Sequence, residues 1–564
     1  MVPALIVALL LAGPPFAESA AAAPAPLFDT PPIAHAPASD VASRSTVRRR
    51  PVASRLSLLV RSDGSAALGV GDRIELNPFD NARFSLTVSE VTRPGASSLA
   101  WSGTLDGVDL GSAVLALDGT ALVGHVRTSV AMYRIGYAGD GTAVVEEIDP
   151  AAFPPEAPSI VPEPDGVPGF DSEPLADVAS QIDVMVVYTA AARAAAGGAA
   201  AMRAEASLAV AAANQAYANN GLAQRLRLVF AGETSIRETN DFPADVGRLA
   251  ADPTVAWLRN ATRADLVSLF TSNGSAVYCG IAYLLTANTP AYGGFAYSLV
   301  ERSCATSTLT FPHEVGHNMG ANHDPFVAGS GPSIAPYSHG YVDLVGKFLT
   351  IMSYPNQCTA AGLFCSRIPY FSTPGWAIGG RPIGNAAASD NARTLAETAN
   401  TVANFRPSVA SPLAITTAVN QASFAIGQKL VVSVTVNFPG GLAGTADFYA
   451  GLMLPDGSAV FFTDVMLPGR GYEQGTITNA ASYRPIATAV PLAGPLVANV
   501  PAFFSYPRQP DDPTGGLAFF LLAVKSGTLT SGTLTSDQLL AASFAPFTFP
   551  ATGSADAACG GCEP

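Results

Sequence analysis

The sequence predicts a multidomain protein in which an α/β region stands between two all-β regions. The chain has 564 residues, more than a single hydrophobic core usually supports. Between residues 179 and 406, apolar strand-like runs alternate with helical segments, which is typical of an α/β layer. On both sides of this region, short apolar runs are separated by turn residues and lack helical periodicity. We therefore expect three folded regions.

Residues 1–23 predict a secretory signal peptide. An apolar run leads into an alanine-rich stretch with small residues at cleavage-site spacing, although no lysine or arginine precedes the run. The run is too short to cross a bilayer, and no later stretch qualifies as a membrane span. We expect a secreted protein with no membrane span after removal of the signal peptide.

Residues 24–148 predict a propeptide with a small all-β domain, and residues 149–178 predict a linker. No regular element is expected before residue 56. Beyond it, Asp-Gly pairs between apolar runs are typical of hairpin turns. The linker is rich in proline and acidic residues, so it should be open to proteolysis. The expected strands of the β domain include Leu56–Val60, Phe84–Val88, Val114–Leu117 and Met132–Ile135.

The region 179–406 is the expected α/β domain. Its strands and helices are predicted from the length and periodicity of the apolar runs. We expect strands over Ile182–Tyr188, Leu226–Phe230, Leu266–Thr271 and Phe295–Val300, and helices over Ala199–Asn219 and Val255–Ala264.

The most specific motif is His-Glu-x-x-His-x-x-Gly-x-x-His, which begins at His313. On a helix, His313 and His317 lie one turn apart on one face, so both imidazoles can bind one metal ion. Gly320 can leave the helix with a positive φ and bring back His323 as a third ligand. Three protein ligands leave a fourth position for water, which is typical of a catalytic zinc site. Glu314 is the expected general base.

A second motif, Thr350-Ile351-Met352-Ser353-Tyr354-Pro355, follows the third histidine. It resembles the Met-turn of the metzincin metalloproteases, and the two motifs occur in the metzincin order. The position of Asp324, directly after the third histidine, resembles the adamalysin/reprolysin branch. Tyr354 is instead similar to the tyrosine that astacins and serralysins place beside zinc. The segments 182–189 and 367–372 resemble bacterial reprolysin-like enzymes, including the peptidyl-Asp metalloendopeptidases.

This resemblance covers roughly residues 180–406 and implies a metzincin catalytic domain, with a twisted mixed sheet, helices, a zinc helix and a Met-turn. It implies that Gly320 and Met352 shape the site. Asp324 is expected to anchor the turn by hydrogen bonds, and the alternative is a minor role on the metal side. Tyr354 is either a hydrogen-bond donor to the oxyanion or a packed aromatic ring.

The peptidyl-Asp resemblance further implies a pocket for an acidic side chain on the carboxyl side of the cleaved bond. Arg367 is the candidate cation, next to Pro369 and Tyr370. The alternative is a surface arginine without a role, because exposed arginines are the rule.

The predicted activity is hydrolysis of peptide bonds in proteins or peptides. Zinc lowers the pKa of a bound water to about 7, and Glu314 takes its proton and passes it to the leaving amine. One alternative is an inactive adhesion or binding protein that uses its C-terminal domain, although all four motif residues are intact. Another is a zinc hydrolase of a non-peptide substrate.

Residues 407–550 predict a β-sandwich, and residues 551–564 form a tail that contains a Cys-x-x-Cys pair. Period-two apolar runs separated by Pro-Gly, Gly-Gly and Asp-Gly turns carry the sandwich prediction. The expected strands include Leu430–Val436, Phe448–Leu454, Val460–Thr463 and Leu517–Val524.

The six cysteines are an even number, which fits an oxidising destination. Proximity in the sequence favours three pairs, although other connectivities are open. These pairs are Cys279–Cys304, Cys358–Cys365 and Cys559–Cys562.

If the propeptide keeps the enzyme inactive, it cannot do so through a cysteine thiolate bound to zinc, because no cysteine precedes Cys279. An aspartate such as Asp171 is a candidate, since a carboxylate can bind zinc. The alternative is a propeptide that only assists folding.

The net charge of −14 argues against a nucleic-acid partner, because the chain would repel phosphates. The sequence implies one catalytic zinc ion. It does not indicate whether calcium binds or what the oligomeric state is.

Overall fold

The computed structural model describes eleven segments of the chain. The expected signal peptide of residues 1–23, Asp171 and the pair Cys559–Cys562 lie outside them. The described segments are residues 24–29, 45–93, 98–139, 141–162, 181–272, 277–406, 413–462, 472–475, 482–529, 534–535 and 537–550.

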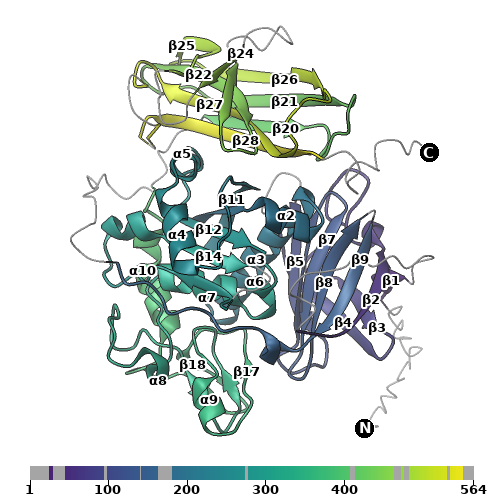
Figure 1. Cartoon of the computed structure of the whole chain (residues 1–564), viewed down its shortest axis with the longest axis vertical. Helices are drawn as coiled ribbons and strands as arrows, with labels where there is room; N and C mark the ends of the chain where they lie inside the picture. The colour runs from purple at the N-terminus through teal and green to yellow at the C-terminus, as the bar shows by residue number, and fades with distance from the viewer. Residues whose placement is uncertain are drawn as a thin grey trace, which may run out of the picture.

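The N-terminal region is a nine-stranded antiparallel sheet in the order β1-β2-β9-β8-β7-β6-β5-β4-β3 (Figure 1). Pro26 also bridges Glu75 of β3, so the two ends of the sheet meet. Its core includes the fully buried Trp101. The strands are β1 (Phe28–Asp29), β2 (Thr46–Ser54), β3 (Arg73–Phe79), β4 (Ala82–Thr92), β5 (Ser98–Leu105), β6 (Ser112–Asp118), β7 (Ala121–Arg127), β8 (Met132–Gly139) and β9 (Thr142–Ile148).

The all-β nature of this region is confirmed, and three of its expected strands fall in β4, β6 and β8. The prediction for Leu56–Val60 is wrong, because residues Leu56–Leu58 form a 3-10 helix in which the amides of Leu59 and Val60 donate to Leu56. A short apolar run has too little periodicity to separate the two states. The strand β2 was also missed, since it lies before residue 56.

The central region is a five-stranded mixed sheet in the order β11-β10-β12-β14-β13. The first four strands are parallel, and β13 is antiparallel to β14 and forms one edge. The expected strands agree with the structure to within a few residues. The observed strands are β10 (Gln181–Tyr188), β11 (Arg225–Glu233), β12 (Leu266–Thr271), β13 (Gly280–Ala282) and β14 (Tyr297–Glu301).

Alternate residues of β10 enter two different cores. Val184 and Val186 pack with α3 (Ala199–Asn219) and α7 (Thr310–Asn318) on one face. Met185 and Val187 pack with α4 (Phe242–Ala251) and α5 (Pro253–Thr262) on the other face. This alternation is what a strand covered on both sides requires. The remaining elements are α2 (Ala190–Ala196), η4 (Pro290–Phe295), α6 (Cys304–Ser307), α8 (Pro325–Ala328), α9 (Asn356–Ala360), α10 (Asn391–Val402), β15 (Val342–Asp343), β16 (Phe348–Leu349), β17 (Ser366–Arg367), β18 (Thr373–Ile378) and β19 (Arg381–Ile383).

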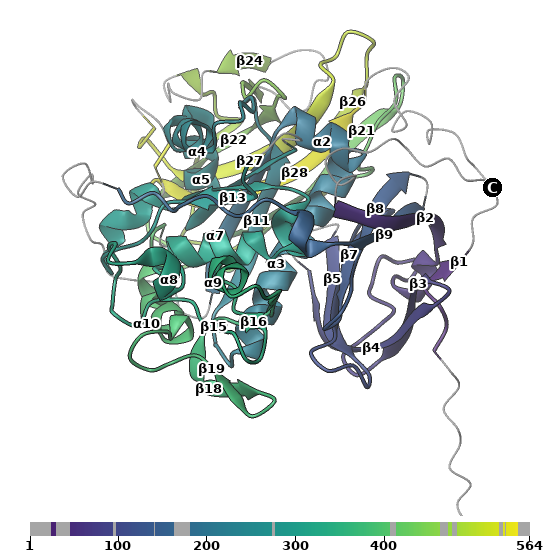
Figure 2. The ribbon, with the colours of Figure 1, turned by 60° about the horizontal axis from the view of Figure 1, so that its bottom comes forward.

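Helix α3 lies between the central sheet and the N-terminal sheet (Figure 2). Its alanines favour helix and allow close approach on both sides. The bounds predicted from the sequence, Ala199–Asn219, are those of the structure. A buried ion pair joins Arg203 of α3 to Asp118 of β6 at 2.8 Å, and Gln215 donates to the carbonyl of Gly103 at 3.1 Å.

An Asp118→Ala variant is expected to lower the thermal unfolding midpoint. Removing one partner of a buried pair leaves an uncompensated charge and costs about 3–5 kcal/mol. Differential scanning calorimetry measures the shift, with the exposed Asp109→Ala as control. Equal midpoints for the two variants would show that the pair does not hold the sheets together.

The segment after β9 differs from the expected open linker. It forms a 3-10 helix over Pro150–Ala152 and then runs parallel to the edge strand β13. The amide of Ala157 donates to Gly280 at 2.8 Å, and that of Ile160 donates to Ala282 at 2.9 Å. Residues 149–152 are exposed as the linker prediction expects, whereas Glu156 and Ala157 are buried, because the free edge of the sheet supplies the partners that the segment lacks alone.

The C-terminal region consists of two antiparallel sheets that share one hydrophobic core. The second sheet also packs on the central region, where Phe520 contacts Trp257 of α5 with ring centroids 5.6 Å apart. The first sheet contains β20 (Ala414–Val419), β21 (Lys429–Phe438) and β26 (Leu496–Pro507). The second contains β22 (Thr445–Met453), β23 (Ala459–Phe462), β24 (Tyr472–Gly475), β25 (Ala487–Pro491), β27 (Gly515–Lys525) and β28 (Leu539–Phe549).

Two disulfides are present, Cys279–Cys304 and Cys358–Cys365. Within the described segments, we find no helix with the length and apolar character that crossing a membrane requires.

Candidate metal centre

Three histidines meet at the C-terminal half of helix α7. Their ring nitrogens lie within 4.8 Å of one another, and all three side chains are buried. His313 and His317 come from successive turns of α7. The chain then leaves the helix at Gly320, whose φ is +90°, and returns with His323. This backbone conformation favours glycine, and a Cβ at this position would also approach the carbonyl oxygen of Leu285 closely, at 3.3 Å.

Main-chain carbonyls orient the two histidines of helix α7. The Nδ1 atom of His313 lies 2.9 Å from the carbonyl of Ile351, and that of His317 lies 2.9 Å from the carbonyl of Ala321. When Nδ1 donates, the lone pair of Nε2 is left for a metal ion. The Nε2 atom of His313 is buried without a hydrogen-bond partner among the described residues. The Nε2 atoms of His317 and His323 face each other at 3.0 Å.

Burial keeps these imidazoles neutral. It lowers the pKa of His313 to about 4 and holds the pKa values of His317 and His323 well below the usual range. Neutral imidazole is the form that binds a metal. An orphaned buried nitrogen, two converging lone pairs and neutral rings together fit one transition-metal ion such as zinc.

The side chain of Glu314 lies beside the three histidines, and its carboxylate forms no hydrogen bond with the described residues. It is fully buried, and neither oxygen has a hydrogen-bond partner in the described part of the chain. Burial, with the nearby charge of Glu156, raises its pKa well above the usual range, and a bound cation would favour the ionised form. A Cβ at Gly280 would lie 2.5 Å from Oε1 of Glu314, so the glycine in β13 makes room for the carboxylate.

The loop around Met352 supports the histidines from below. Met352 is fully buried, and a Cβ at Gly316 of α7 would lie 2.7 Å from its sulfur. Asp324 accepts a hydrogen bond from the amide of Tyr354 at 3.0 Å, which ties the third histidine to this loop. The imidazole of His339 in turn contacts the carbonyl of His323 at 2.9 Å.

Tyr354 combines ring packing with a polar contact. Its ring centroid lies 4.3 Å from that of His323. Its hydroxyl donates to the carbonyls of Glu156 at 2.8 Å and Ala157 at 3.1 Å. The side chain is therefore more than a packed ring, because it binds peptide carbonyls next to the metal ligands.

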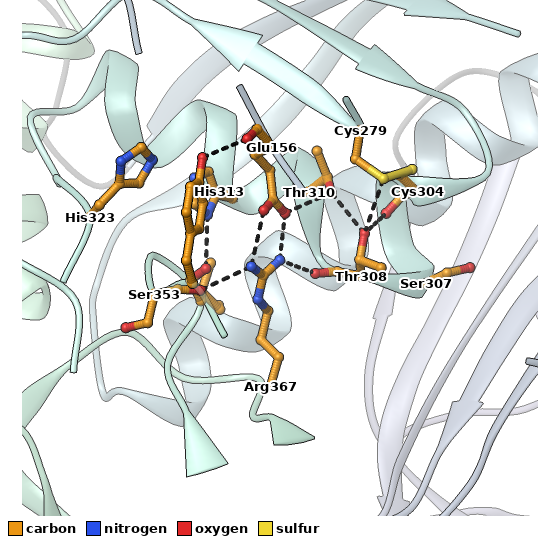
Figure 3. A network of polar contacts seen from close by, with 12 residues as sticks. Glu156, Cys279, Cys304, Ser307, Thr308, Thr310, His313, His323, Ser353 and Arg367 are labelled. Carbon is orange, nitrogen blue, oxygen red and sulfur yellow. Dashed lines mark hydrogen bonds and ion pairs between the residues drawn. A yellow bond between two sulfur atoms is a disulfide. The ribbon is translucent and has the colours of Figure 1, made fainter. Parts of the chain in front are cut away.

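Arg367 lies inside the site and not on the surface. Its side chain is 12% exposed and forms an ion pair with Glu156, whose side chain is 3% exposed (Figure 3). The guanidinium also donates to the carbonyls of Thr308 at 2.7 Å and Ser353 at 3.0 Å. Burial alone would raise the pKa of Glu156, but the positive charge of Arg367 holds it at about 2. The surface alternative for Arg367 is wrong.

Pro369 and Tyr370 have structural contacts in the same loop. The carbonyl of Pro369 accepts from Asn219 of α3 at 2.9 Å. The carbonyl of Tyr370 accepts from the amide of Ile351, and its side chain packs against a small apolar cluster of Phe348, Ile368 and Ile383. These contacts position the strand end that carries Arg367, and the Cys358–Cys365 disulfide closes the loop before it.

Glu156 and Thr310 also belong to the site, and neither was predicted from the sequence. The hydroxyl of Thr310, in the first turn of α7, donates to Glu156 at 3.0 Å. Thr310 stands three residues before His313, a place that the motif leaves unspecified. Glu156 lies in a proline-rich stretch with no spacing relation to the metal motif, so no local signal points to it.

Comparisons with known proteins agree with this geometry. A family model described as metallo-peptidase family M12 matches residues 178–372. The peptidyl-Asp metalloendopeptidase of Xanthomonas campestris pv. campestris is 31% identical over 429 residues, which are 71% of this chain and 97% of the relative. The protein of the same name from Stenotrophomonas maltophilia is 32% identical over 52% of this chain and 70% of the relative. The one from Pseudomonas aeruginosa is 33% identical over 40% of each chain.

Proposed function

Because the chain belongs to metallopeptidase family M12 and is a zinc metalloendopeptidase, we propose that it cleaves peptide bonds with Glu314 as general base. The observation that carries this proposal is the pairing of three converging histidines with a buried, unengaged carboxylate one residue after the first of them. Because the three histidines and Glu314 are all present, the site does not favour the alternative of an inactive binding protein.

A bound zinc ion supplies the Lewis acidity that polarises the scissile carbonyl and acidifies the attacking water. His313, His317 and His323 would hold it, and the main-chain hydrogen bonds of His313 and His317 fix the tautomers of those two rings. Glu314 accepts the proton from the attacking water and delivers it to the leaving amine.

Tyr354 is proposed to donate a hydrogen bond to the oxyanion. Its hydroxyl already donates to two peptide carbonyls beside the histidines, which supports this role. A Tyr354→Phe variant should therefore lower kcat by roughly 10–10³-fold with little change in KM. Steady-state kinetics on one peptide substrate measures both constants, and an unchanged kcat would leave only the packing role.

Specificity is proposed to favour an acidic residue on the carboxyl side of the cleaved bond. The relatives from Xanthomonas and Stenotrophomonas carry the name peptidyl-Asp metalloendopeptidase. In this chain, the side chain of Arg367 is only 12% exposed and binds a carboxylate next to the metal ligands. A planar guanidinium can bind a carboxylate through two hydrogen bonds, which makes it suited to select such a side chain.

We also propose that the protein works outside the cytoplasm. Its two disulfides support this, because such bonds persist in oxidising compartments.

A digest of casein by the purified protein tests the proposed activity, with a chelator and with zinc restored after it. We expect fragments in the absence of the chelator, none in its presence, and recovery with zinc. Intact casein under all conditions, despite removal of the N-terminal region, would contradict peptidase activity.

A further inference from the structure

Residues 153–162 lie on the central sheet in the way that a bound peptide does. They add to the free edge of β13, where Ala157 and Ile160 donate to the strand and Leu284 donates back to Ile160 at 2.8 Å. Extended peptides commonly bind to exposed sheet edges through such main-chain hydrogen bonds. Tyr354 binds two further carbonyls of the segment at the metal site. The segment therefore takes the surface that a substrate would need.

The carboxylate of Glu156 lies in a pocket lined by hydrogen-bond donors, and the main donor is fixed in place by other parts of the chain. Arg367 is fixed by the carbonyls of Thr308 and Ser353, and it binds both carboxylate oxygens of Glu156. Thr310 adds a hydroxyl donor at 3.0 Å (Figure 3). Without Glu156, the pocket would hold a buried cation with no carboxylate, which is unfavourable until another carboxylate enters.

We infer that Arg367 and Thr310 form a carboxylate-binding subsite beside the zinc ligands, and that Glu156 occupies it as an internal competitive ligand that keeps the full chain latent. This inference rests on the proposed function. It makes Thr310 a second determinant of the preference for acidic side chains. Latency then comes from an acidic side chain in the substrate subsite, and not from a propeptide group bound to the metal.

Two features of the chain hold the internal ligand in place. Pro155 and Pro158 flank Glu156 and Ala157 and restrict the main chain to extended conformations. Upstream, Arg127 of the N-terminal sheet donates to the carbonyls of Thr306 and Ser307, just before the zinc helix. A ligand tethered in this way competes at a high effective concentration, so a free acidic peptide is excluded from the full chain.

The test measures binding of a fluorescein-labelled hexapeptide with a single aspartate to the zinc-loaded full chain. All proteins carry Glu314→Ala to prevent self-cleavage, and fluorescence anisotropy reports the Kd. Adding Glu156→Gln should tighten probe binding about tenfold or more, since it weakens the tethered competitor. Asp149→Asn, seven residues earlier in an exposed cap, should change nothing. Adding Arg367→Ala or Thr310→Val to Glu156→Gln should weaken the binding again.

Equal probe affinity with and without Glu156→Gln would overturn the inference. The inference would also fail if Glu156→Gln tightened probe binding and adding Arg367→Ala did not weaken it again. Because the readout is binding, this failure is distinct from an absence of peptidase activity. If Glu156→Gln does not fold, hydrogen exchange on the wild-type chain decides. We expect protected amides at Ala157 and Ile160, and rapid exchange at both would contradict an occupied site.

Discussion

In the processed protein, from which a cut within residues 149–178 has removed the N-terminal region, a Glu314→Ala variant is expected to lose about 10²–10⁴-fold of the peptidase activity, which is the usual effect of removing a positioned general base. The carboxylate is buried and free of hydrogen bonds among the described residues, so nothing else in the site offers it a structural role. The three histidines are unchanged, and zinc should remain bound. The initial rate on an internally quenched peptide measures the loss, and elemental analysis measures the zinc content.

The matched control for this variant is Glu397→Ala, which removes an exposed glutamate from α10. It should retain wild-type activity. If Glu314→Ala cleaves at the wild-type rate, the assignment of the general base is wrong. If it loses zinc together with activity, the carboxylate acts by supporting the metal and not by proton transfer.

An Arg367→Ala variant should lose its preference for acidic residues. Truncating a buried, hydrogen-bonded charge partner costs about 2–5 kcal/mol, so kcat/KM on a peptide with aspartate after the cleaved bond should fall by about 30-fold or more. A peptide with alanine at that position should be cleaved with little change. The comparison of the two peptides measures selectivity and removes general effects on the catalytic residues.

Two further variants separate charge from structure at Arg367. Arg367→Lys keeps the charge but loses the second hydrogen bond, so it should retain part of the preference. Arg381→Ala removes an arginine that pairs with Asp343 at the surface of the same region, and it should leave the cleavage pattern unchanged. An unaltered pattern in Arg367→Ala would remove this residue from the specificity pocket.

The sequence predicted those features that depend on local spacing. The histidines follow from helical periodicity and from one glycine, and helix α3 follows from an alanine-rich run that ends at Asn219. The alternating strands of the central sheet were found because each is a short apolar run between turn residues.

The features that the sequence did not predict depend on long-range contacts. Glu156 meets Arg367 across 211 positions of the chain, and their contact exists only because the edge of β13 was free to take the segment. Nothing near Arg367 in the sequence separates a buried arginine from an exposed one. The 3-10 helix at Leu56–Leu58 has a different cause, since its run is too short to show a period.

We propose that one metal ion on His313, His317 and His323 and the carboxylate of Glu314 together hydrolyse peptide bonds. The most direct test removes metal from the processed protein with a chelator and titrates zinc back, while cleavage of a quenched aspartate-containing peptide is followed. We expect activity in the wild type to rise to a plateau at one equivalent of zinc. Glu314→Ala should take up the same equivalent and stay inactive. Cleavage by the metal-free protein, or full activity in the zinc-loaded variant, would show that this assignment of the metal and the general base is wrong.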